Sequence, residues 1–156
     1  MQKGFLVTIV SAVVLGLGYV YAPPGAAAEV LITPNEAMLP DSPDAATAGG
    51  VRGLTRGPTS EQILPDPRGK GIKSPFSLHI QFVAHNNTLV VPDSVRVIYL
   101  KLPSVDLTSR IKRHLTSKGI DISDTEVPVG THVLRIEMQD SQGRAGVGII
   151  KLSVIP

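Results

Sequence analysis

Apolar and polar residues alternate along several short stretches in the second half of the chain. The clearest runs are Phe76–Ala84, Thr131–Gln139 and Arg144–Val154, in which every second residue is apolar. A period of two is typical of a β-strand with one buried face. The last two runs are joined by a turn from Asp140 to Gly143, which has glycine where a hairpin turn needs positive φ. We therefore expect three strands here, of which the last two form a hairpin.

Three further stretches predict strands with weaker or different patterns. Ser60–Leu64 is a weak first strand. Val95–Lys101 is apolar on both faces, so another element should cover Ile98 and Leu100. Ile120–Val127 is short and resembles an edge strand.

One stretch has helical periodicity. Leu107, Ile111 and Leu115 recur at intervals of four residues, which places them on one helical face. Asp106 is a suitable N-cap and Gly119 a suitable end signal. We expect a short helix over 106–115 that covers the outer face of the strand at Val95–Lys101.

Six or seven short strands in about 100 residues, with turn signals every eight to twelve residues, favour an all-β fold. We predict an antiparallel β-sandwich over residues 57–156 with one short helix in the middle. Gly146 and Gly148 interrupt the last strand and predict a β-bulge there.

The first part of the chain has the pattern of an export signal followed by a linker. Lys3 precedes 17 uncharged residues from Gly4 to Val20, and small residues at 26–28 offer a cleavage site after Ala28. We expect a signal peptide over 1–28 and a periplasmic or secreted product, although 17 residues also suffice for an uncleaved membrane anchor. Residues 29–56 are rich in proline, glycine and alanine, which predicts a flexible linker.

The second half resembles bacterial secreted immunoglobulin-like (fibronectin type III-like) domains over residues 57–156. The resemblance rests on the break at 56–58, the entry to a strand at 74–76, the Pro-x-Gly corner at 128–130 and the Asp-x-x-Gly turn at 140–143. It implies structural roles at the two corners for His132, Gly130, Asp140 and Gly143. In immunoglobulin domains a corner tyrosine lies two residues before a core position, and His132 occupies that place before Leu134.

Metal-binding chemistry has weak candidates only. His79 and His132 are conceivable copper ligands, and Asp121 and Asp124, with Asp140, are conceivable calcium ligands. None of the four histidines has the spacing of a local metal motif. We therefore expect no metal and no other cofactor, and we keep a periplasmic copper- or calcium-binding protein as the alternative function.

Composition narrows the function further. After residue 28 the chain holds 14 basic and 13 acidic residues, a net charge of +1, which argues against a nucleic-acid partner. No Gly-x-Ser-x-Gly motif is present, so we expect no enzyme. A basic cluster could meet an anionic partner: Arg110, Lys112, Arg113 and Lys118. We expect an exported, non-enzymatic binding or accessory module that docks to an envelope or secreted protein and contacts membrane only if the leader is retained.

Overall fold

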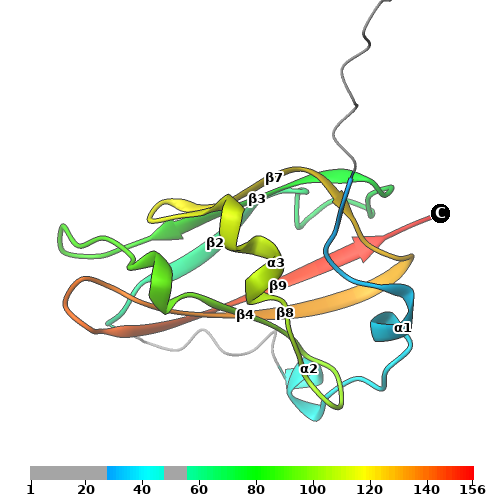
Figure 1. Cartoon of the computed structure of the whole chain (residues 1–156), viewed down its shortest axis with the longest axis horizontal. Coiled ribbons are helices and arrows are strands. Elements are labelled where there is room, and N and C mark those ends of the chain that lie inside the picture. Colours follow the sequence, from blue (N-terminus) through cyan, green and yellow to red (C-terminus); the bar gives the residue numbers. More distant parts are fainter. Residues whose placement is uncertain (1–27, 48–55) are drawn as a thin grey trace, which may run out of the picture.

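The computed structural model describes residues 28–47 and 56–156. The predicted signal peptide therefore lies outside the described residues, apart from Ala28. The described residues form two β-sheets that face each other as separate layers (Figure 1). The prediction of an all-β sandwich is confirmed.

The first sheet has five strands in the order β1, β7, β3, β2, with β6 also paired to β7. All its pairs are antiparallel except β1–β7, which is parallel. Its strands are β1 (Glu29–Val30), β2 (Thr59–Leu64), β3 (Phe76–Val83), β6 (Leu115–Thr116) and β7 (Gly119–Glu126).

The second sheet has four antiparallel strands in the order β5, β4, β8, β9. They are β4 (Arg96–Tyr99), β5 (Val105–Asp106), β8 (Gly130–Gln139) and β9 (Ala145–Val154). The short helices are α1 (Pro34–Ala37), α2 (Pro43–Thr47), η2 (Pro92–Ser94), α3 (Thr108–Ile111) and η3 (Lys112–His114).

The core lies between the two sheets, where the alternating positions of the strands meet. Both central strands bury every second side chain. In β3 these are Phe76, Leu78, Ile80 and Phe82, and in β8 they are His132, Leu134, Ile136 and Met138. The period-two pattern therefore gave the correct buried face for both strands.

The predicted helix at 106–115 is shorter and placed differently. Its regular part is α3, followed by the tighter turn η3, while Leu115 already belongs to β6. Leu107 and Ile111 join the core, and α3 lies between the edges of the two sheets (Figure 1). The chain is held there because Leu107 N donates to Val97 O and Val97 N donates to Thr108 Oγ1. The helix thus closes one side of the sandwich.

The predicted bulge in the last strand is also wrong. The pairing of β8 with β9 runs without a register shift from Gly130 with Val154 to Gln139 with Ala145. Gly146 and Gly148 serve another purpose, because a Cβ at either position would overlap Pro58 O or Ser60 Oγ. The two glycines let the start of β2 approach the edge of β9.

The prediction of a flexible linker is wrong for residues 29–47, and residues 48–55 lie outside the described part. Residues 28–47, which we name the N-terminal strap, form β1, α1 and α2 along the side of the sandwich (Figure 1). Leu31 and Ile32 are each 1% exposed and belong to the core. Complete burial of two such side chains contributes about 1.5–3 kcal/mol each, which offsets part of the entropy lost on ordering the strap.

Candidate functional site

His132 closes a corner of the second sheet. It lies near the start of β8 and is 2% exposed. Its Nε2 donates to the carbonyl of Pro128 over 2.8 Å, and its Nδ1 lies 2.7 Å from the hydroxyl of Tyr99. Because a carbonyl only accepts, Nε2 carries the proton and Nδ1 accepts from Tyr99. Burial lowers the pKa of His132 and so favours this neutral ring.

Lys101 extends the same buried network to the strap. The side chain is mostly buried, its Nζ lies 5.4 Å from the centre of the Tyr99 ring, and it donates to Asp41 over 2.7 Å. Burial disfavours its charge, but the interactions with Asp41 and Tyr99 together outweigh burial, and the pKa of Lys101 is raised. Asp41 also pairs with Lys101 through a β-bridge, so this network fastens the strap to the second sheet.

Asp140 organises the hairpin between β8 and β9. Its Oδ1 accepts from the backbone of Gln142 and Arg144, and its Oδ2 accepts from Arg144 Nε at 2.7 Å and from Thr88. Burial raises the pKa of Asp140, but these hydrogen bonds lower it by more, so the net shift is downward. Gly143 adopts φ of +74° in the turn. Asp140 is thus fully engaged in holding the turn and has a structural role.

The candidate metal ligands do not come together. His79 and Asp121 form a cross-strand pair between β3 and β7, with Nδ1 and Oδ2 3.6 Å apart. His132 belongs to the opposite sheet, and both its ring nitrogens are hydrogen-bonded. Asp124 is an exposed residue further along β7. Within residues 28–47 and 56–156, no group of three or more potential ligands is close enough to hold a metal.

The basic cluster predicted to meet an anionic partner is only partly free to bind one. Arg110 forms two hydrogen bonds with Glu36, at 2.7 and 2.8 Å, and donates to Leu31 O. Arg113 and His114 both contact the carboxylate of Glu29. Two of the four predicted cations therefore hold the strap, while Lys112 and Lys118 are exposed.

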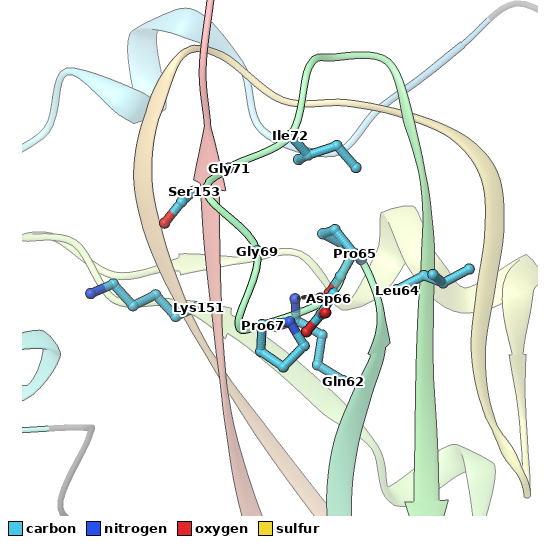
Figure 2. Close-up of a pocket in the computed structure, with 10 residues that line it drawn as sticks. All are labelled: Gln62, Leu64, Pro65, Asp66, Pro67, Gly69, Gly71, Ile72, Lys151 and Ser153. Atoms are coloured by element: carbon cyan, nitrogen blue, oxygen red, sulfur yellow. Dashed lines mark hydrogen bonds between the residues drawn. The ribbon is translucent and has the colours of Figure 1, made fainter.

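A cavity of about 230 Å³ lies where β2 leaves β9, and we name it the seam cavity (Figure 2). β2 lies close to β9 at Gly148, and the loop after β2 pairs with β9 at Ile72, opposite Val154. The cavity is the gap between these two contacts. Its lining comes from β2, the loop and β9: Gln62, Leu64, Pro65, Asp66, Pro67, Gly69, Gly71, Ile72, Lys151 and Ser153.

The backbone of Lys151 faces this gap. Val133, which pairs with Lys151, directs its carbonyl away from β9 to accept from Leu100 N. The pair of Val133 and Lys151 is therefore a non-hydrogen-bonded one, and the N–H and C=O of Lys151 point away from β8. Ser153 shows the same orientation because its carbonyl accepts from Ile72 N. Among the described residues, no backbone group pairs with those of Lys151.

No protein family model, curated protein or solved structure matches this chain.

Within the described ranges, no helix combines the length and hydrophobicity needed to cross a membrane. The sequence reasoning identified the two corners but missed the seam cavity and the buried Lys101. The seam cavity forms where the loop after β2 separates from β9, and a contact between segments so far apart in the sequence leaves no local pattern. The prolines and glycines of the loop after Leu64 were the only available signal: Pro65, Pro67, Gly69 and Gly71.

Proposed function

We propose that this chain is an exported, non-enzymatic immunoglobulin-like binding or accessory module of the bacterial envelope, which docks to another protein. The strand order is the observation that carries this proposal. The order β2-β3-β7 facing β5-β4-β8-β9 corresponds to strands A-B-E facing C′-C-F-G of the immunoglobulin pattern. His132 at the start of the F-like strand bonds back to Pro128 as a corner tyrosine does. Domains with this scaffold serve mainly as binding and spacer modules, which is an argument by analogy.

The seam cavity is the docking surface that we assign to this function. An extended segment of a partner can add to a strand edge through backbone hydrogen bonds, and side-chain pockets then select the segment. Lys151 offers both an N–H and a C=O at the cavity, and Leu64, Pro65 and Ile72 supply an apolar wall. The length of the gap limits the added strand to a few residues, which favours a short peptide segment of the partner.

Two variants at one position separate the backbone of Lys151 from its side chain. Lys151→Ala keeps the outward N–H, whereas Lys151→Pro removes it without removing a hydrogen bond to β8. The tagged full-length protein and both variants are crosslinked in their own cells, purified and read by mass spectrometry. We expect one reproducible envelope partner with the wild type and Lys151→Ala, and a loss of that partner with Lys151→Pro. Circular dichroism of each purified variant verifies that it is folded. Equal capture by a folded Lys151→Pro variant, or no partner with any chain, contradicts the proposal.

A further inference from the structure

The bond expected to be cut during export lies at the first residue of a docked strand. Glu29 begins β1 and pairs with Thr125 of β7, while Val30 pairs with Glu126. Leu31 N continues this parallel ladder by donating to Glu126 O over 3.0 Å. The Ala28–Glu29 bond is therefore adjacent to the ladder, with no spacer between the bond and the folded domain.

Side chains at the start of β1 and directly after it hold this strand against β7. The Glu29 side chain is 14% exposed, and its carboxylate contacts Arg113 and His114. Two positions further on, Leu31 and Ile32 are buried in the core. Displacing β1 from β7 thus breaks the ion pairs of Glu29 and exposes apolar side chains to water.

A peptidase needs the opposite arrangement at the bond that it cuts. Cleaved segments are exposed and flexible, and a peptidase binds them as an added extended strand. Glu29, the residue directly after the bond, is paired with β7 and its carboxylate is held by Arg113 and His114, so the bond cannot enter a peptidase cleft while β1 is docked. Cleavage of a folded chain therefore requires the strap to detach first.

We propose that the Ala28–Glu29 bond is a processing site that folding masks, so that it is cut only before β1 docks on β7. The inference rests on the proposed export of the chain. In the reaction a signal peptidase adds water across the amide bond. Ala28 leaves as a carboxylate at the end of the leader, and Glu29 keeps the nitrogen as a new α-ammonium group. A chain whose strap docks first keeps its leader, so the order of the two events determines whether the domain is released or remains attached.

The size of the effect follows from the cost of detaching the strap. When opening is fast relative to cleavage, the cleavage rate follows the population of the open form. Exposure of Leu31 and Ile32 alone makes this population small, and we expect the folded chain to be cut at least about a hundredfold more slowly than the undocked chain.

The test compares three presentations of the same bond to purified signal peptidase in detergent. In the first, the full-length chain is translated with the peptidase present. In the second, the full-length chain is folded in detergent before the peptidase is added. In the third, a folded variant carries the four-residue spacer Gly-Ser-Gly-Ser between Ala28 and Glu29. The spacer moves the cleaved bond away from β1 without altering the strap. The N-terminal residue of each product is determined by mass spectrometry.

We expect rapid cleavage after Ala28 in the first and third cases, and at least a hundredfold slower cleavage in the second. A second variant, Ile32→Asp, weakens docking and should accelerate cleavage of the prefolded chain. Equal rates for the folded chain and its spacer variant overturn the masking. If the chain is uncut even during translation, the leader is not a signal peptide, and the proposed export fails together with this inference.

Discussion

Arg110 of the helical segment donates two hydrogen bonds, of 2.7 and 2.8 Å, to the carboxylate of Glu36 in the N-terminal strap. The two residues lie 74 positions apart in the sequence. The Arg110 hydrogen bonds are the main cause that lowers the pKa of Glu36 to about 2. This pair joins a segment without strand or helix periodicity to the folded sandwich, so it provides a direct measure of how firmly the strap is held.

The pair predicts a specific dependence of stability on pH. The pKa of Glu36 is lower in the folded chain than its ordinary value of 4.5, so its contribution is complete above that value. It is lost as the pH falls from about 4.5 to about 2. We expect Glu36→Gln to lower the free energy of unfolding by about 1–2 kcal/mol at pH 7, since the pair is partly exposed to solvent. The difference from wild type should shrink toward pH 2.

Urea unfolding at several pH values measures this difference. Asp44→Asn is the matched control, because Asp44 is an exposed carboxylate of the same strap whose side chain forms no hydrogen bond in the described part of the chain. A pH-independent effect of Glu36→Gln would show that the ion pair is not its cause.

The buried apolar residues of the strap predict a larger loss of stability. Ile32→Ala leaves a cavity in the core, and such truncations cost about 2–5 kcal/mol. Met38→Ala changes a strap residue that is 80% exposed and should alter stability by less than about 0.5 kcal/mol. Thermal and urea unfolding of both variants make the comparison. If residues 29–47 were a flexible linker, the two variants would behave alike.

The contact of β2 with β9 predicts that a side chain at residue 148 clashes with Ser60 and that removal of the Ser60 side chain relieves the clash. A Cβ at residue 148 would overlap Ser60 Oγ, so Gly148→Ala should cost about 1–3 kcal/mol through overpacking. Removing the Ser60 side chain in the double variant Gly148→Ala, Ser60→Gly should recover part of this loss. Urea unfolding of the two single variants and the double variant completes the cycle. Strictly additive effects would contradict direct contact between these positions.

His132 predicts a second dependence of stability on pH, in the same direction as that of Glu36 but in a higher pH range. Burial lowers its pKa from the ordinary value of 6.5, so below that value the unfolded chain binds a proton that the folded chain does not. The contribution of the neutral ring is complete above pH 6.5 and declines as the pH falls toward the lowered pKa. His132→Phe removes this dependence and should cost about 1–3 kcal/mol at pH 8, because the buried Tyr99 hydroxyl loses its acceptor.

Unfolding curves between pH 8 and pH 5 test this prediction. His85→Gln, at an exposed position outside the core, serves as the control and should keep the wild-type pH dependence. A wild-type slope that persists in His132→Phe would assign the dependence to another group.

The sequence predicted the long strands well because their alternation reflects a burial pattern that each strand carries locally. The expected strand at 76–84 is β3, and the expected hairpin at 131–154 is β8 and β9 with the turn at Asp140. The strap was missed because Val30, Leu31 and Ile32 are only three consecutive apolar residues, too few to show a period. A local signal was nevertheless present, since Thr33 and Glu36 form a capping box around Pro34.

The candidate site was harder to predict because it depends on contacts between distant segments. Lys101 is buried only because Asp41 and the Tyr99 ring surround its amino group. Gly146 and Gly148 were predicted to form a bulge, because glycine within a strand marks either a bulge or the close approach of another segment. Only the position of β2 shows that close approach is the reason here. Arg110 and Arg113 were assigned to a cluster that meets an anionic partner, because their acidic partners Glu36 and Glu29 lie in a segment predicted to be flexible.

The most direct test of docking at the seam cavity is site-specific crosslinking. The chain has no cysteine, so Lys151→Cys and Asp124→Cys each carry a single thiol, one beside the cavity and one on the exposed surface of the other sheet. Each purified variant is labelled with a photoactivatable crosslinker and added to the envelope fraction of its own cells. The account predicts one crosslinked protein through residue 151 that is absent through residue 124. The same products from both positions, or none from residue 151, would contradict it.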